Sequence, residues 1–222
     1  MRNPTGKYVE QGQEMQGISE AFGKHYAKKL EEHGPTAAGV DWIKEESANS
    51  SYHYALKLIR PEHIESKIKV LDVGCGYGGL LTYAKQQGFD IDYTGVDIVP
   101  EMISHGKNLH PDAKFIAGDF LKVGDVGCYD YVVCNGAMTI KLQASILDMH
   151  RYADAMIRKL YEACQIGMAF NVMTTRVNFQ AENSYYRSPV ETLAFCLSEL
   201  SDRVIIDHDH PRYQFWTYVY RQ

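Results

Sequence analysis

The sequence lacks long hydrophobic runs and an apolar leader. No stretch approaches the roughly 20 apolar residues that a membrane-spanning helix requires. Residues 1–13 are polar and include glycine, so they do not contain the apolar core of a secretory signal peptide. We therefore expect a cytoplasmic protein without a membrane partner.

Closely spaced cysteine pairs are also absent. The five cysteines form no C-x-x-C pair, and they are Cys75, Cys128, Cys134, Cys164 and Cys196. Most of them fall in or beside segments that we expect to be buried. Small apolar thiols in a reducing compartment explain this distribution better than disulfides or a zinc site. We therefore expect neither disulfides nor a metal site.

An excess of positive charge is missing as well. The chain has 28 acidic and 23 basic residues, which gives a net charge of −5 at pH 7. The protein as a whole therefore has no electrostatic reason to bind nucleic acid. Composition does not indicate an oligomeric state.

The length of 222 residues suits one domain with a substantial core. We assign residues 1–64 to an N-terminal arm and helical cap, and residues 65–222 to the core of the same domain. Within the first part we expect helices over residues 19–32 and 47–59. Residues 1–17 are expected to form a loosely docked arm that orders over a ligand.

The core is organised around residues 70–79, which read Val-Leu-Asp-Val-Gly-Cys-Gly-Tyr-Gly-Gly. The aliphatic start is typical of a central parallel strand that is covered on both faces. Gly74, Gly76 and Gly78 then allow a sharp turn and a close approach of the backbone to a ligand. A helix over residues 79–87 would direct its first amides at that ligand.

Two ligands suit this turn. Gly74, Gly76 and Gly79 satisfy the spacing G-x-G-x-x-G, so an NAD-dependent oxidoreductase is one interpretation. Asp72, however, would repel a pyrophosphate and attract a cationic group. The motif resembles the first motif of class I S-adenosylmethionine-dependent methyltransferases, where the acidic residue helps to hold the methionine end. This resemblance favours S-adenosylmethionine as the cofactor.

From residue 67 the pattern alternates between strand and helix. Further strands are expected at 91–96, 113–117, 129–134 and 167–172, and the chain closes with a hairpin of 203–207 and 213–221. These segments predict an α/β fold, a Rossmann-like seven-stranded sheet of five parallel strands and a C-terminal antiparallel hairpin, with an N-terminal helical cap. The closing hairpin resembles the class I methyltransferase sheet, whereas a dinucleotide-binding domain would normally end with another parallel strand.

Ligands of open α/β sheets bind at the carboxyl ends of the strands. Gly74, Cys75 and Gly76, with Asp72 nearby, are expected along the methionine and sulfonium part. Asp97 ends the second strand, where its carboxylate could accept both ribose hydroxyls or, alternatively, cap the following helix.

The later strand ends complete the predicted cofactor site. Ile98 and Met102 could flank the adenine ring. The run Gly118-Asp119-Phe120 is similar to the adenine motif of the family, with a carboxylate for the exocyclic amine and a ring face. Asn135 is expected closest to the transferred methyl group, although Asn-Gly is also a common turn pair.

Methyl transfer from a sulfonium is an in-line displacement with an activated leaving group. The enzyme mainly positions the reactants and excludes water, and it needs a base only if the nucleophile starts protonated. Candidate catalytic residues are His25 on the cap helix, Asn135 and His208. His208 and His210 could also form a metal pair, but a plain hairpin turn fits them better.

The acceptor is harder to predict. A base-amine methyltransferase would be expected to show Asn- or Asp-Pro-Pro-aromatic after the fourth strand, but residues 134–138 read Cys-Asn-Gly-Ala-Met. Candidate substrate-binding residues from the cap and the later loops are Tyr26, Trp42, Lys141, Arg176, Tyr185 and Tyr186. Lys141 and Arg176 could receive a phosphate or carboxylate, or could simply face solvent.

Several short patterns, among them Glu-His-Gly-Pro-Thr near the N-terminus and Gly-Val-Asp-Trp after it, resemble a group of small bacterial methyltransferases associated with metabolite or surface-polysaccharide modification. We therefore predict methyl transfer to an oxygen of a small polar or sugar-like acceptor. The prediction includes an anionic acceptor. Two alternatives stay open: the NAD-dependent oxidoreductase, and a non-catalytic S-adenosylmethionine-binding regulator.

Overall fold

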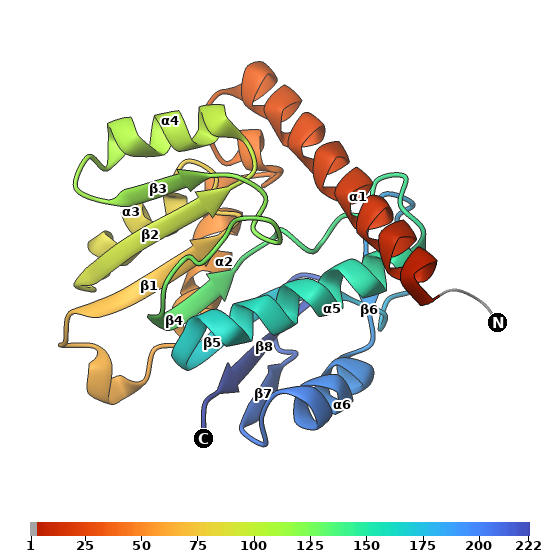
Figure 1. Ribbon diagram of the computed structural model, residues 1–222. Coiled ribbons are helices and arrows are strands. Elements are labelled where there is room, and N and C mark those ends of the chain that lie inside the picture. The colour runs from red at the N-terminus through yellow and green to blue at the C-terminus, as the bar shows by residue number, and fades with distance from the viewer. Residues whose placement is uncertain (1–3) are drawn as a thin grey trace.

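The computed structural model describes the backbone of residues 4–222 and the side chains from residue 17 onward. Its centre is one twisted sheet with the order β3-β2-β1-β4-β5-β8-β7 (Figure 1). The strands are β1 (Ile68–Val73), β2 (Ile91–Asp97), β3 (Lys114–Ala117), β4 (Tyr129–Cys134), β5 (Cys164–Thr174), β7 (Val204–Asp207) and β8 (Gln214–Tyr220). The predicted α/β fold with five parallel strands and a closing antiparallel hairpin is confirmed.

The strand count differs slightly from the prediction. An additional two-residue strand, β6 (Tyr186–Arg187), pairs in parallel with the end of β5, so the sheet has eight strands rather than seven. A two-residue strand is too short to show any hydrophobic period. Within the hairpin, β8 runs antiparallel to both β5 and β7.

Apolar side chains cover both faces of the sheet. On one face, α2 (Glu45–Leu56) and α3 (Gly79–Gln86) pack against Val70 and Tyr131. On the other face, α1 (Pro4–His33), α5 (Ile146–Ala163) and α6 (Pro189–Glu199) pack against Leu71 and Val132. Successive residues of β1 thus enter opposite halves of the core, as expected for a central parallel strand.

Three smaller elements complete the chain. Helix α4 (Pro100–Leu109) lies beside β2 and β3, and Ile103 packs there with Phe115. Two short 3₁₀ helices, η1 (Ala38–Val40) and η2 (Pro61–His63), precede the sheet. Because α2 packs on the same sheet as the later helices, the N-terminal part adds to the core; the division at residue 64 stays a prediction.

The first helix is longer than predicted. Instead of starting at residue 19 after a loose arm, α1 begins at Pro4. Ser19, where the helix was expected to begin, is a buried residue inside it. Proline suits the first turn of a helix, and Glu, Gln and Met in residues 10–16 favour its continuation. The expected arm is helical over residues 4–17, its ordering over a ligand stays a prediction, and residues 1–3 lie outside the described part of the chain.

The position of α1 matters for function. It crosses the molecule near the carboxyl ends of β1 and β2 (Figure 1). Phe22 packs edge-on against Tyr152 of α5, with 5.7 Å between the ring centroids. This contact helps to hold the helix above the edge of the sheet where a ligand is expected.

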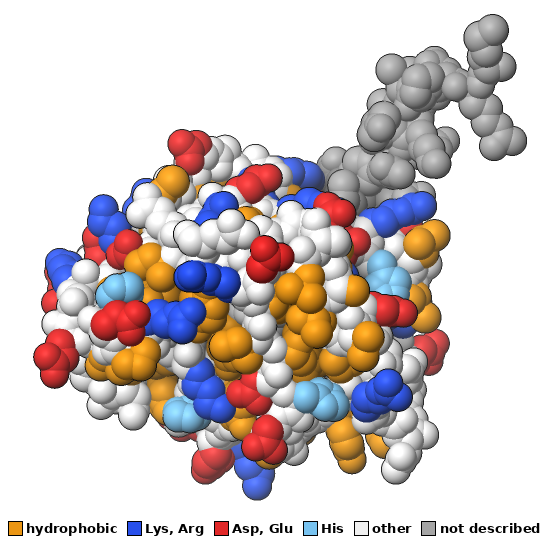
Figure 2. All heavy atoms as spheres, turned by 90° about the horizontal axis from the view of Figure 1, so that it is seen from below, with side chains coloured by type: hydrophobic (Ala, Val, Ile, Leu, Met, Phe, Trp, Pro, Cys, Tyr) orange, Lys and Arg blue, Asp and Glu red, His pale blue; other side chains and the backbone are white. Residues whose placement is uncertain are grey.

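Two surface properties bear on partners. Among the described residues, no helix is both long and apolar enough to cross a membrane. On the face shown in Figure 2, acidic and basic side chains are interspersed around the apolar ones. This face therefore carries no large field of one sign.

Candidate active site

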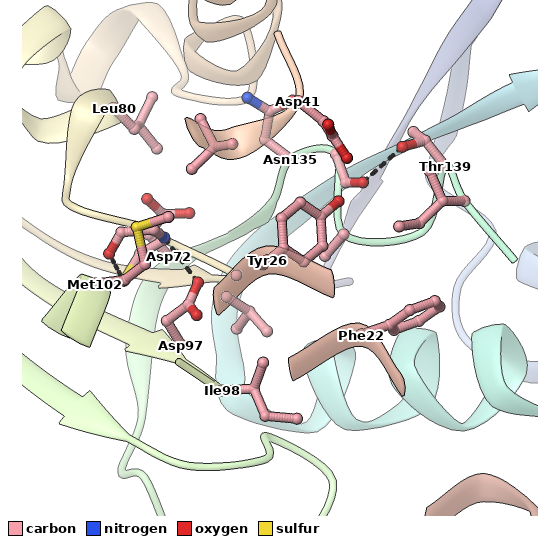
Figure 3. A pocket seen from close by; sticks show the side chains of 18 of the residues that line it. Phe22, Tyr26, Asp41, Asp72, Leu80, Asp97, Ile98, Met102, Asn135 and Thr139 are labelled. Atoms are coloured by element: carbon pink, nitrogen blue, oxygen red, sulfur yellow. Dashed lines mark hydrogen bonds between the residues drawn. The ribbon is translucent and has the colours of Figure 1, made fainter. Parts of the chain in front are cut away.

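A cavity of about 460 Å³ opens at the carboxyl ends of β1, β2 and β4, beneath α1 (Figure 3). All eleven residues predicted for the cofactor line it, namely Asp72, Gly74, Cys75, Gly76, Asp97, Ile98, Met102, Gly118, Asp119, Phe120 and Asn135. Four strand ends that are separated in sequence therefore meet at one place. The parallel sheet accounts for this because it aligns the carboxyl ends of its strands at one edge.

The glycine turn after β1 is tightly fixed. The amides of Gly74 and Cys75 both donate to the carbonyl of Val96, at 2.8 and 3.1 Å. Gly74 has a φ of 75°, and a Cβ there would stand 2.8 Å from the Cβ of Ala137. Both the backbone angle and the space therefore require glycine.

Asp97 joins the glycine turn to the second strand. One carboxylate oxygen accepts the amide of Gly76 at 2.8 Å, and the other accepts the amide of Val99 at 2.9 Å. The N-cap of α4 is Val99, so the alternative role of Asp97 as helix cap is wrong. Burial raises the pKa of Asp97, although the backbone amides that it accepts oppose this shift. A carboxylate has about four acceptor sites, so Asp97 can still accept from a ligand.

Asp72 lies at the base of the cavity and is almost fully buried. One of its oxygens accepts the hydroxyl of Tyr93 at 2.7 Å. Burial raises the pKa of Asp72 to about 7, with the charge of Asp97 as a smaller cause, and the bond from Tyr93 opposes the rise. A cationic ligand group would stabilise the ionised carboxylate here.

Asp119 follows β3 and keeps one acceptor unused. Its Oδ1 accepts the amide of Leu121 at 3.0 Å. Its Oδ2 is buried, makes no hydrogen bond, and has the ammonium of Lys122 at 3.7 Å. Phe120 is buried beside it. A buried acceptor without a donor is costly, so this atom is suited to a donor on a ligand.

Asn135 lies both in a turn and in the cavity wall, and its place beside the transferred methyl group stays a prediction. It lines the cavity, and its side-chain oxygen accepts the hydroxyl of Ser51 at 2.7 Å. Gly136 after it has a φ of 83°, and its amide donates to Asn171 at 2.7 Å. The pair is thus a turn that also directs a side chain to the cavity.

The predicted substrate residues divide into two groups. Tyr26 and Trp42 line the cavity. Four others do not, namely Lys141, Arg176, Tyr185 and Tyr186.

Three of these four side chains bond to other residues, and the fourth faces solvent. The Tyr185 hydroxyl bonds to His150 inside the core at 2.7 Å, and Tyr186 accepts the amide of Ala181 at 3.0 Å. Lys141 donates to the carbonyl of Leu142 at 3.3 Å, and Arg176 is exposed. The loop after β5 therefore contributes less to the cavity than we expected.

The candidate histidines are not in the cavity wall. His25 contacts the carboxylate of Asp41, which does line the cavity. His208 bonds through Nε2 to the hydroxyl of Thr174 at 2.9 Å. Among the described residues, no group of three or more His, Cys, Asp or Glu is placed to hold a metal.

A family model described as "Methyltransferase domain" matches residues 64–211. The chain belongs to this family. This membership confirms the prediction of a methyltransferase. It argues against the alternative prediction of an NAD-dependent oxidoreductase.

A curated relative supports the assignment. This methyltransferase is 31% identical over 147 residues to "Putative methyltransferase Rv1506c" of Mycobacterium tuberculosis, a match that covers 65% of the chain and 87% of that protein.

Solved structures share the fold. A magnesium protoporphyrin IX methyltransferase (ChlM) from Synechocystis PCC 6803 with bound SAH has a TM-score of 0.65 at 13% identity, and 94% of this chain and 100% of that one are covered. DhpI in complex with SAH has a TM-score of 0.63 at 19% identity, with 93% and 97% covered. These likenesses confirm the Rossmann-like methyltransferase fold.

Sequence reasoning missed several lining residues of the methyltransferase, namely Asp41, Tyr52, Arg212 and Gln214. Asp41 has a φ of 62°, and its carboxylate also pairs with Lys29 at 3.0 Å. The run Gly-Val-Asp-Trp contained the only signal for Asp41, since it places a charged residue beside a large aromatic one. Nothing near Arg212 in the sequence marked it out from other surface arginines.

Proposed function

We propose that this methyltransferase moves the methyl group of S-adenosylmethionine to an oxygen of a small polar acceptor. The observation that carries the proposal is the trio of carboxylates at successive strand ends, Asp72, Asp97 and Asp119, all facing one cavity. The unused buried oxygen of Asp119 is the strongest part of this fit, because an adenine amine would supply its missing donor.

The roles assigned to these residues follow the shape of the cofactor. Asp97 would accept the ribose hydroxyls with its remaining acceptor capacity. Ile98, Met102 and Phe120 would enclose the adenine ring, and Met102 and Phe120 are buried there. The turn from Gly74 to Gly76, with Asp72 beneath it, would hold the methionine end. We call these residues of β1 to β3 the cofactor half of the cavity.

The remaining wall would hold the acceptor. Asp41, Trp42, Asn135, Arg212 and Gln214 line it, and we call these residues the acceptor half. When bound, S-adenosylmethionine supplies a methyl group activated by a cationic sulfur. The chain itself positions the acceptor and excludes water, and α1 contributes Phe22 and Tyr26 to that enclosure.

Proton removal would use Asp41 rather than a histidine directly. Its carboxylate lines the cavity and is held by His25 and Lys29, both from α1. An acceptor hydroxyl could donate its proton to the Asp41 carboxylate, and His25 would hold that carboxylate in position. His208 is bonded to Thr174 outside the cavity wall and would take no part in this step.

Similar folds act on different acceptors. Besides the magnesium protoporphyrin IX enzyme, CalS10 from Micromonospora echinaspora, an amino pentose methyltransferase, has a TM-score of 0.58 at 12% identity, with 78% of this chain and 91% of that one covered. Both enzymes are named for small-molecule acceptors, which supports a small-molecule acceptor here. We propose a polar or sugar-like one, and no nucleic acid.

Calorimetric titration tests the cofactor. We expect S-adenosylhomocysteine to bind in the micromolar range, about −8 kcal/mol, while NAD does not bind. Asp119→Ala should weaken both S-adenosylhomocysteine and adenosine about tenfold, because both contain the adenine amine. Asp112→Ala, which changes an exposed aspartate before β3, at the end of the strand away from the cavity, is the control and should change neither.

The outcomes separate the remaining alternatives. NAD binding alone would refute the proposal. Binding of S-adenosylhomocysteine without methyl release to any acceptor in a broad screen would favour the non-catalytic regulator. Equal adenosine affinity in both variants would remove the role given to Asp119.

A further inference from the structure

Arg212 differs from the other cavity residues in charge. It belongs to the connection between β7 and β8 and lines the cavity. Among the described lining residues it is the one Lys, Arg or His side chain, whereas four are aspartates, Asp41, Asp72, Asp97 and Asp119. A cationic group in an otherwise acidic cavity is suited to an anionic part of a ligand.

The guanidinium of Arg212 has no acidic partner among the described residues. Other arginines of the chain do: Arg187 pairs with Asp154 at 2.7 Å, and Arg158 pairs with Glu199 at 3.2 Å. Arg212 instead lies over the ring of Trp42, 5.6 Å from its centroid. Stacking on an aromatic face leaves the N–H groups at the guanidinium edge available for an oxyanion.

Arg212 is on the acceptor side of the cavity. Gln214, two residues later, accepts the amide of Asn171 at 3.0 Å, and Asn171 in turn accepts the amide of Gly136 at 2.7 Å. Arg212 covers Trp42, and a Cβ added at Gly136 would lie 3.5 Å from the ring of Trp42. These contacts connect Arg212 to the turn beside Asn135.

The sheet separates Arg212 from the predicted adenine site. Asp119 follows β3 at one edge of the sheet, whereas Arg212 precedes β8, on the other side of β1, β4 and β5. The remaining acid near this region, Asp41, is already paired with His25 and Lys29. An anion at Arg212 would therefore not face an uncompensated carboxylate there.

We propose that Arg212 binds a carboxylate or phosphate group of the methyl acceptor. The inference rests on the proposed function, because it takes the acceptor to occupy this half of the cavity. It replaces Lys141 and Arg176 as the expected anion-binding residues. Arginine suits either oxyanion through paired N–H donors.

The test uses the indole signal of Trp42 in NMR spectra, since Trp42 contacts Arg212. Acetate, inorganic phosphate and neutral acetamide are titrated into the full-length protein, both free and loaded with S-adenosylhomocysteine. We expect one or both anions to shift the signal saturably, with acetate and phosphate distinguishing a carboxylate from a phosphate site. Acetamide should have little effect.

Variants decide the assignment. Arg212→Gln should weaken anion binding at least about tenfold, and Arg212→Lys should retain part of it because the charge remains. Arg176→Gln, an exposed arginine outside the cavity wall, is the matched control and should bind like the wild type.

Two results would overturn the proposal. The first is equal anion binding by the wild type and Arg212→Gln, including no saturable binding by either. The second is loss of S-adenosylhomocysteine binding in both Arg212 variants, which would assign the side chain to the carboxylate of the cofactor. If wild-type protein fails to bind S-adenosylhomocysteine, the proposed function fails, and the titration of free protein still tests Arg212.

Discussion

The two halves of the cavity are built in different ways. In the cofactor half, backbone groups fix most of the geometry: Asp97 accepts two amides, and the amides of Gly74 and Cys75 share one carbonyl, while Asp72 accepts a side-chain hydroxyl from Tyr93. In the acceptor half, side chains hold one another, as in the contacts of Asn135 with Ser51 and of Arg212 with Trp42. A site fixed by backbone is set by local chain geometry, whereas a site fixed by side chains can change with few substitutions.

This difference predicts that the largest effect comes from Asp97→Ala. The change leaves the amides of Gly76 and Val99 without their acceptor and removes the partner proposed for the ribose. We expect S-adenosylhomocysteine affinity to fall about 100-fold or more by calorimetry, since each bond to a charged group contributes about 1.5–3 kcal/mol.

The matched control for this change is Asp92→Ala, an exposed aspartate on the same strand. Its affinity should equal that of the wild type. If Asp97→Ala also bound like the wild type, the backbone-held half would not be the cofactor site.

A pair of glycine variants separates two reasons for the turn geometry. Gly74 and Gly88 have φ values of 75° and 84°, but only Gly74 would place a new Cβ against a neighbour, Ala137. Gly88→Ala should lower the free energy of unfolding by about 1–2 kcal/mol through backbone strain alone. Gly74→Ala should lower the free energy of unfolding by more than Gly88→Ala does, as measured by urea denaturation. Equal decreases in the two variants would show that the contact with Ala137 is readily relieved.

Asp72 predicts a pH dependence confined to the cofactor half. Its pKa in the folded protein is raised from 3.8 to about 7. Between these values the unfolded chain releases the proton and the folded protein keeps it, so this contribution to stability is complete below pH 4 and is lost as the pH rises through 7. Asp72→Asn cannot ionise, and its melting temperature should therefore fall less than that of the wild type between pH 5 and pH 8.

The affinity for a ligand should depend on pH in the direction opposite to that of the stability, through the same residue, Asp72. The ionised carboxylate attracts the ammonium of S-adenosylhomocysteine, so wild-type affinity should rise from pH 5.5 to pH 8. Asp72→Asn should bind more weakly with a flatter pH profile. A steep profile in the variant would assign the titration to another group.

The smallest effect is expected in the acceptor half. Ser51→Ala removes the hydroxyl that donates to Asn135 and frees that side chain. We expect methyl transfer to fall about threefold to tenfold, in line with one neutral hydrogen bond of about 1 kcal/mol, while S-adenosylhomocysteine affinity stays the same. An equal loss of cofactor affinity would show that the two halves are not independent.

Much of the cofactor half could be predicted because its information is contiguous. A buried strand, a glycine turn and an acidic residue occur within residues 70–79, and Asp97 and Asp119 each follow their own strand directly. Parallel pairing then aligns these strand ends without any further information. The start of α6 is similarly local, since Ser188 accepts the amide of Glu191 at 3.3 Å, as an N-cap does.

The acceptor half depends on contacts between distant segments. Trp42 and Arg212 are brought together by the packing of the N-terminal region and the closing hairpin on the same sheet. Lys141 and Arg176 have the right chemistry in a plausible loop, yet they do not line the cavity. Side-chain direction in a loop is decided by tertiary packing rather than by local pattern.

The sequence by itself determined the α/β order, the glycine turn and the acidic strand ends, because each follows from residues that are neighbours along the chain. Only the tertiary structure decided that Asp41 and Arg212 face the same cavity. The physical reason is that these features depend on burial and pairing between segments far apart in the chain, which no local period records.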